Sequence, residues 1–143
     1  MLDHSRCFFT EGSIALPEGY RDQSINVLLA DDELAPSLNI SRDVIPSDET
    51  LSDYLSRQLD ALASNIQGWV LKAREPAVLG RGAVAGECIL TSYLLDGVRV
   101  WQYQAVFVLA SGQILVFTLA MARELTQQDD TLLQQVLSSY REA

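Results

Sequence analysis

The sequence predicts an α+β fold, an antiparallel twisted sheet of about six to eight strands with one inserted helix and one C-terminal helix. Asp96-Gly97 and Ser111-Gly112 are tight hairpin signals that join three long apolar stretches, which indicates three consecutive strands. Two other stretches, 50–65 and 126–140, repeat apolar residues every three or four positions, as amphipathic helices do. At 143 residues, without a linker or a low-complexity segment, the chain fits one domain over residues 1–143.

The strands follow from alternating or apolar stretches between turn residues. Glu11-Gly12 separates the first two strands as a hairpin, and a turn with Pro17 and Gly19 follows them. Glu75-Pro76 and Gly80-Arg81-Gly82 are expected to break a later run of strands. The expected strands are residues 6–10, 13–15, 22–30, 37–42, 69–74, 87–95, 98–110 and 113–122.

The strand that begins at Ser37 carries the most informative pattern, and it is expected to pair with the strand at 22–30. Its period-two alternation separates Leu38, Ile40 and Arg42 on one side from Ser37, Asn39 and Ser41 on the other. One side is mainly apolar, and the other is small and polar. We expect the function on the polar side.

Two helices complete the fold. The first is expected from about Thr50 to Asn65, after the capping residues Ser47-Asp48-Glu49-Thr50, and Gln58 flanks its apolar stripe. That stripe consists of Leu51, Tyr54, Leu55, Leu59, Leu62 and Ile66. Thr126 is the expected N-cap of the second helix. Its expected buried stripe consists of Leu132, Leu133, Val136, Leu137 and Tyr140.

The strand at 98–110 is apolar on both faces, with Gln102 and Gln104 among valines on one of them. If helices cover only one side of the sheet, a second protein layer or a ligand must cover the other. A buried carboxamide without partners costs on the order of 1 to 3 kcal/mol. Either Gln58 and Gln102 bond to local backbone or water, or they line a groove for an apolar peptide helix. Small residues and amides are also what membrane helices use to pack together.

Composition limits the partners. The net charge of −9 disfavours nucleic acid and anionic membranes, which would repel the chain. No signal peptide is visible at Met1, and the longest apolar runs are far shorter than the ~20 residues that span a bilayer. We therefore expect a cytoplasmic protein that is not itself a membrane protein. Cys7 and Cys88 are expected to be free thiols, with a disulfide as the less favoured alternative.

The sequence contains no recognisable catalytic constellation. His4 is the only histidine, and the two cysteines lack any Cys-x-x-Cys or Cys-His spacing. The acidic groups Asp31-Asp32-Glu33 and Asp129-Asp130 are explained by a solvated loop and a helix N-terminus. We expect no cofactor, no metal site and no catalytic residue, and hence a binding protein before an enzyme.

Three segments resemble the Eag-type chaperones of bacterial type VI secretion systems. They are the run from Asp22 to Leu28, the Leu38-Asn39-Ile40-Ser41-Arg42-Asp43 strand and the Tyr54-Leu55-Ser56-Arg57-Gln58-Leu59 helix. The opening from Gly12 to Tyr20 also fits the family, with Leu-Pro followed by Gly and an aromatic residue. The resemblance covers essentially the whole length.

The resemblance implies a PsbP-like fold and a homodimer. Such chaperones bind the N-terminal transmembrane segments of effectors, often Rhs-type toxins, and help load them onto the VgrG spike. The resemblance carries over Ile25 and Val27 as apolar floor, Ser37, Asn39 and Ser41 as small or polar contacts, and Gln58 and Gln102 as hydrogen-bonding groups. A small-molecule or lipid carrier that uses the same sheet face is the alternative function, and an enzyme is the third.

Overall fold

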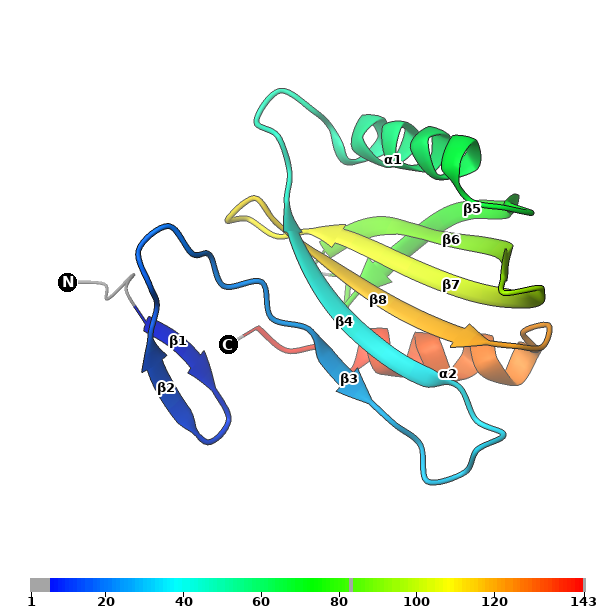
Figure 1. Cartoon of the computed structure of the whole chain (residues 1–143), viewed down its shortest axis with the longest axis horizontal. Coiled ribbons are helices and arrows are strands. Elements are labelled where there is room, and N and C mark those ends of the chain that lie inside the picture. The colour runs from blue at the N-terminus through cyan, green and yellow to red at the C-terminus, as the bar shows by residue number, and fades with distance from the viewer. Residues whose placement is uncertain (1–5, 83, 143) are drawn as a thin grey trace.

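The structure, a computed structural model, describes residues 6–82 and 84–142. Its main body is a six-stranded antiparallel sheet with one helix on each face, and a separate two-stranded sheet precedes it (Figure 1). In chain order the elements are β1 (Arg6–Phe9), β2 (Gly12–Ala15), β3 (Asn26–Leu28), β4 (Ser37–Val44), α1 (Leu51–Asn65), β5 (Val70–Leu79), β6 (Val84–Leu95), β7 (Val98–Val108), β8 (Gln113–Met121) and α2 (Gln127–Ser138). The expected α+β class is confirmed.

The main sheet has the strand order β3-β4-β8-β7-β6-β5. Strands β5 to β8 form a meander, and the Asp96-Gly97 turn between β6 and β7 has positive φ at both residues, 51° and 80°, as a tight hairpin requires. Strand β4 then pairs with β8, although a helix and three strands separate them in the chain. The expected pairing of β3 with β4 is also present.

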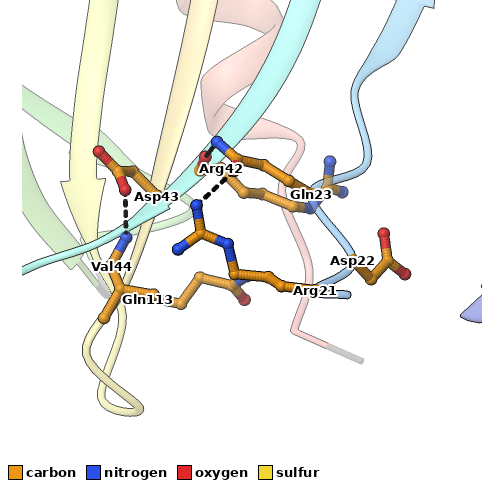
Figure 2. Close-up of a pocket in the computed structure, with 7 residues that line it drawn as sticks. All are labelled: Arg21, Asp22, Gln23, Arg42, Asp43, Val44 and Gln113. Atoms are coloured by element: carbon orange, nitrogen blue, oxygen red, sulfur yellow. Dashed lines mark hydrogen bonds between the residues drawn. The ribbon is translucent and has the colours of Figure 1, made fainter. Parts of the chain in front are cut away.

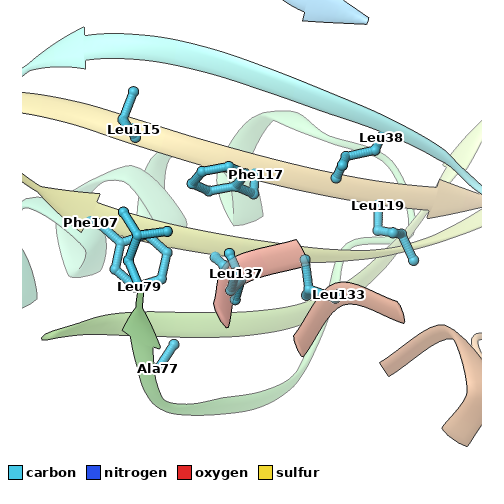
Figure 3. Packing of buried hydrophobic residues seen from close by; sticks show 10 residues of the cluster. Leu38, Ala77, Leu79, Phe107, Leu115, Phe117, Leu119, Leu133 and Leu137 are labelled. Atoms are coloured by element: carbon cyan, nitrogen blue, oxygen red, sulfur yellow. The ribbon is translucent and has the colours of Figure 1, made fainter. Parts of the chain in front are cut away.

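The two helices lie on opposite faces of the sheet. Leu133 and Leu137 of α2 pack into a buried cluster with Phe107 and its neighbours, as Figure 3 shows. Tyr54, Leu55 and Leu59 of α1 pack with Val106 and its neighbours. Because Val106 and Phe107 are adjacent in β7, they point to opposite faces. The doubly apolar strand β7 is thus explained in part by a second protein layer, α1.

Several expected boundaries are wrong. Strand β3 spans only Asn26–Leu28 instead of residues 22–30. Strand β5 continues through Glu75-Pro76, since it is an edge strand and the missing N–H of proline can face away from its single neighbour. Leu132, expected in the buried stripe of α2, is 39% exposed. The buried side of α2 is centred on Leu133 and Leu137, and Leu132 lies at its margin.

Both helices have a threonine N-cap: Thr126, as expected, and Thr50, one of the four capping residues expected before the first helix. Thr50 Oγ1 accepts a hydrogen bond from the Asp53 backbone N–H at 3.2 Å. Thr126 and Asp129 form a reciprocal capping box at the start of α2, in which the Asp129 carboxylate accepts from the Thr126 N–H at 2.7 Å. Asp129 also pairs with Arg123 at 2.8 Å. Its burial is therefore explained by local bonding.

Candidate functional site

Small and polar side chains from three neighbouring strands lie together on the sheet face that carries α1. Asn39 lies opposite Thr118, which in turn lies opposite Gln104. Residues directly opposite in antiparallel strands share a face, so each such row is one strip across the sheet. We call the resulting surface the floor; it consists of Ser37, Asn39, Ser41, Gln102, Gln104, Thr118 and Ala120. All of these residues are half-buried.

The other face of the same strands is the main core. Leu38, Phe117 and Leu119 are 7%, 5% and 0% exposed, and they alternate with floor residues along β4 and β8. The alternation expected for β4 is therefore confirmed. The floor is the polar side of strands whose apolar side is covered by α2.

Helix α1 borders the floor without covering it. Tyr54 Oη donates a hydrogen bond to Asp43 of β4 at 2.6 Å, so this edge of α1 faces β4. Gln58 follows Tyr54 by one helical turn and lies on the same edge. The buried stripe of α1 packs over Ile89, Val106 and Ile114, beside the floor. Gln58 therefore lies at the border between the helix and the floor.

The opposite edge of α1 is clamped to β5 and β6 by Arg74. Its guanidinium pairs with Glu87 and donates to Ser56 Oγ at 2.9 Å and to the Ser52 carbonyl at 2.9 Å. Arginine is suited to this role because its planar fork can donate in several directions at once. The clamp holds α1 toward β5 and leaves the β4 side of the face open.

Two of the floor-side amides lack protein partners. Gln104 Nε2 donates to Thr118 Oγ1 at 3.4 Å, a long bond. Among the described residues, neither Gln58 nor Gln102 has a side-chain hydrogen bond, and both are half-buried. The sequence left two alternatives for Gln58 and Gln102: hydrogen bonds to local backbone or water, or a place in a groove for an apolar helix. Hydrogen bonds from these two side chains to local backbone are not observed. Their amide groups are available to water or to a bound partner.

Thr91 extends the row that contains Gln102, because the two residues lie opposite each other in β6 and β7. Thr91 is fully buried, and its Oγ1 has no hydrogen-bond partner among the described residues. A buried hydroxyl without a partner costs about 1 to 3 kcal/mol. This unpaired group lies next to the floor.

Ile25 and Val27 lie at the margin of the site. Val27 pairs with Asn39 and so shares the face of the floor, and it is 57% exposed. Ile25 precedes β3 and is 60% exposed. The structure thus brings Val27, Ser37, Asn39, Ser41 and Gln102 onto one face, with Gln58 at its border and Ile25 in the segment leading to it.

A small polar pocket lies beyond the end of the floor, where β4 meets β8 (Figure 2). Its lining includes Arg21, Gln23 and Arg42. Arg21 donates to Gln23 Oε1 at 2.9 Å, and Gln23 Nε2 donates to the Arg42 carbonyl at 3.3 Å. Sequence reasoning did not identify this pocket, because residues 22–25 were expected to lie in a strand, whereas in the structure they belong to the loop before β3. Other polar groups of its lining bond to residues outside it, Arg42 to Ser24 and Asn26, and Asp43 to Tyr54.

Two titratable side chains, Tyr54 beside the floor and Cys88 on the opposite face of the sheet, are held in their protonated forms. Burial and the Asp43 carboxylate raise the pKa of Tyr54 to about 12. Burial raises the pKa of the Cys88 thiol to about 11, so it stays protonated at neutral pH. Both Cys7 and Cys88 are free thiols. His4 lies outside the described residues.

No metal centre is formed by the residues that the structure describes, since none of them cluster as three or more His, Cys, Asp or Glu side chains. In the same part of the chain, neither helix is long and apolar enough to cross a membrane. The arrangement offers surfaces and hydrogen-bonding groups.

Comparison with known proteins places the fold. A protein-family model described as DcrB matches residues 11–139. The crystal structure of PA94 from Pseudomonas aeruginosa, a protein of unknown function described as a candidate regulator, is 23% identical, with a TM-score of 0.72 over 96% of each chain. No curated protein matches the sequence.

Two further solved structures are similar. The cyanobacterial PsbP protein CyanoP from Synechocystis sp. PCC 6803 is 15% identical, with a TM-score of 0.52 over 87% of this chain and 82% of that one. LpqN of Mycobacterium tuberculosis, which is involved in cell envelope biogenesis, is 17% identical, with a TM-score of 0.50 over 81% and 76%. At these identities the likeness shows the fold alone, and it confirms the expected PsbP-like architecture.

Proposed function

The chain belongs to the DcrB family, and from its floor we propose that it is a non-catalytic chaperone for apolar peptide helices. The observation that carries the proposal is the floor itself, a strip of small and polar side chains on an otherwise apolar sheet, bordered by α1. Small side chains allow a helix backbone to approach closely, and amides can bond polar groups on that helix. Gln58 and Gln102 have free amides at this place.

The openness of the site favours a peptide over a small molecule. The floor residues are half-buried on a sheet face that α1 covers only at one side. Sites for small ligands are usually concave and enclose most of the ligand. A helix of about 10 Å diameter needs a long, open strip. Strands β4, β7 and β8 provide such a strip in adjacent rows.

The client in this proposal is the N-terminal transmembrane segment of a type VI secretion effector, such as an Rhs-type toxin, bound in the cytoplasm before loading onto the VgrG spike. The resemblance of Leu38 to Asp43 and of Tyr54 to Leu59 to Eag-type chaperones supports this choice. An apolar helix of ~20 residues would otherwise aggregate or insert into the wrong membrane. A homodimer would offer two floors, one for each of two helices.

The test is co-purification of a co-expressed effector fragment that begins with its apolar segments. Wild-type protein should keep the fragment soluble. The double variant Gln58→Ala/Gln102→Ala should retain at least tenfold less, because two hydrogen bonds of about 1 kcal/mol each would be lost. Ser41→Trp should reduce retention further by blocking close approach.

The matched control is Gln128→Ala/Gln135→Ala, two exposed amides on α2 at the other face. This variant should retain the fragment as the wild type does. Wild-type protein that leaves the fragment insoluble would contradict the chaperone proposal. A lipid extracted from the purified protein, without any peptide binding, would favour the carrier alternative.

A further inference from the structure

Two segments singled out in the sequence, residues 38–43 and 54–59, are joined in the structure by a side-chain hydrogen bond. Tyr54 Oη on α1 donates to Asp43 Oδ2 near the end of β4 at 2.6 Å. The other carboxylate oxygen of Asp43 accepts from the Val44 N–H at 2.8 Å (Figure 2). Neither Asp43 nor Tyr54 belongs to the floor, so the bond between them has a role other than direct contact with a client.

The bond between Tyr54 and Asp43 is short and charge-assisted. A hydrogen bond to an ionised acceptor is about twice as strong as one between neutral groups. The hydrogen bond from Tyr54, and then that from the Val44 N–H, lower the pKa of the Asp43 carboxyl below its ordinary value of 3.8. The pKa of Tyr54 is raised to about 12. The acceptor is therefore ionised and the donor protonated throughout the neutral pH range.

The ring of Tyr54 is fixed by its surroundings. Tyr54 is buried, and Arg57 Cζ lies 5.5 Å from the centroid of its ring, within the range of a cation–π contact. The Arg57 guanidinium donates to both carboxylate oxygens of Glu49, at 2.7 and 3.0 Å. Glu49 lies in the connection between β4 and α1. Because the ring is held in place, its hydroxyl bonds the helix itself to β4.

Helix α1 is hydrogen-bonded to the sheet along both of its edges. Arg74 of β5 donates to the Ser52 carbonyl and to Ser56 Oγ on one edge, and Tyr54 donates to Asp43 of β4 on the other. Three strands separate β4 from β5 in the sheet. Apolar packing beneath the helix is non-directional, whereas hydrogen bonds require a defined geometry. The two sets of bonds therefore set the position of α1 across the sheet. Without the bond to Asp43, only the bonds toward β5 remain.

Gln58 depends directly on the position of α1. It follows Tyr54 by one turn on the same edge of the helix, while the floor residues belong to the sheet. Its side chain makes no hydrogen bond to any other described residue. Only the backbone of α1 therefore places the Gln58 amide beside the floor. A displacement of about 1 Å is enough to disturb a hydrogen bond that this amide makes.

We propose that Asp43 and Tyr54 are positioning residues of the client site: their hydrogen bond holds α1 where the Gln58 amide can bond to a helix on the floor. The proposal rests on the proposed function, because it requires a client to which Gln58 bonds. Asp43 and Tyr54 act through α1 and need no contact with the client. The floor residues on β4, β7 and β8 keep their places without this bond, because strand pairing holds them.

The first test is a double-mutant cycle between Tyr54 and Gln58, measured as retention of the co-expressed effector fragment that begins with its apolar segments. Tyr54→Phe removes only the hydroxyl and should reduce retention about fivefold. Gln58→Ala should do the same, because one hydrogen bond to the client is lost in each case. The double variant should also lose about fivefold, since Tyr54 acts through Gln58. Independent effects would multiply to about 25-fold.

Substitutions of Asp43 test the same bond from its other end and keep the test decisive if Tyr54→Phe disturbs folding. Asp43→Leu cannot accept a hydrogen bond and should match Tyr54→Phe. Asp43→Asn keeps an oxygen that can accept from the Tyr54 hydroxyl, so its retention should stay within about twofold of the wild type. The matched control is Tyr103→Phe, the same chemical change on the face covered by α2. It should retain the fragment as the wild type does.

The second test needs no client. In crystal structures superposed on β6, β7 and β8, α1 of Tyr54→Phe should lie about 1 Å or more closer to β5 than in the wild type, and α1 of Tyr103→Phe should not move.

An unmoved α1 in Tyr54→Phe, unchanged retention by this variant, or a loss of about 25-fold in the double variant would overturn the positioning role. Wild-type protein that captures no fragment overturns the proposed function alone. The position of α1 in Tyr54→Phe then still decides whether the bond to Asp43 positions the helix.

Discussion

Thr91 has a side chain whose burial is unfavourable for the stability of the folded state. Its hydroxyl is fully buried in β6 without a partner among the described residues. Thr91→Val replaces the hydroxyl by a methyl group of similar size, which removes the unpaired polar atom. We expect the variant to be about 1 kcal/mol more stable, as measured by urea unfolding.

The matched control for Thr91 is Thr118→Val on β8. Thr118 is half-buried, and its hydroxyl accepts from Gln104. Its replacement should not stabilise the protein, because a bonded and partly solvated hydroxyl is lost. If Thr91→Val were also neutral or destabilising, the Thr91 hydroxyl must be satisfied in solution, for example by water.

Asp129 gives the protein a defined response to acid. Hydrogen bonds from Arg123, and then from Thr126, hold the pKa of the Asp129 carboxyl below its ordinary value of 3.8. The carboxylate therefore contributes its full stabilisation above the unfolded pKa, and this stabilisation is lost as pH falls through the lower folded pKa. Asp129→Asn should be about 1 kcal/mol less stable than the wild type at neutral pH.

The pH series provides the check on Asp129. The difference in unfolding free energy between the wild type and Asp129→Asn should shrink as pH falls below the ordinary carboxyl pKa of 3.8 and through the lower folded pKa, because the wild-type carboxyl then becomes neutral. Urea unfolding at each pH measures it. A difference that stays constant over this range would mean that the capping geometry, and not the charge, determines the loss.

At the scale of single residues, the sequence predicted the polar side of β4 but only part of the floor. Ser37, Asn39 and Ser41 were visible because alternation along one strand is a local pattern. Thr118 and Ala120 were missed, since they lie within the apolar run of β8 and join the floor only through the pairing of β8 with β4. That pairing brings together residues about eighty positions apart, and no local pattern records it.

At the scale of elements, α1 depends on Arg74 for its place on the sheet. Arg74→Leu should destabilise the protein by roughly 2 kcal/mol, because Glu87 and Ser52 lose charged hydrogen-bond donors while partly buried. Arg74→Lys should recover less than half of this loss, since an ammonium group cannot form the same fork. Urea unfolding measures both variants.

The control for Arg74 is Arg81→Leu, an exposed arginine in the loop before β6, which should change stability little. Arg74→Leu should also weaken client retention if the clamp keeps α1 off the floor. Retention equal to that of the wild type would indicate that packing of Tyr54, Leu55 and Leu59 alone positions the helix.

The elements themselves were largely predictable. The caps at Thr50 and Thr126 and the turn at Asp96-Gly97 were found because each has a specific local requirement. The length of β3 and the passage of β5 through Pro76 were not, because edge position is a property of the sheet and not of the segment. The same holds for the placement of the two helices on opposite faces.

At the scale of the whole molecule, the two faces of the sheet differ in how far a helix covers them. The face of α2 is closed by the cluster around Phe107, Leu119 and Leu137. The other face is closed only where α1 lies and carries the floor beside it. Stability therefore rests mainly on one layer contact, and part of the other sheet face is not covered by a helix.

The alternation of floor and core along the same strands has a consequence for protein engineering. In β4 the floor occupies odd positions, and in β7 and β8 it occupies even positions, while the residues between them form the core. A library that varies only the floor positions can therefore sample new surface chemistries without touching Leu38, Phe117 or Leu119. The side chains of one sheet face can thus be exchanged while those of the core face stay as they are.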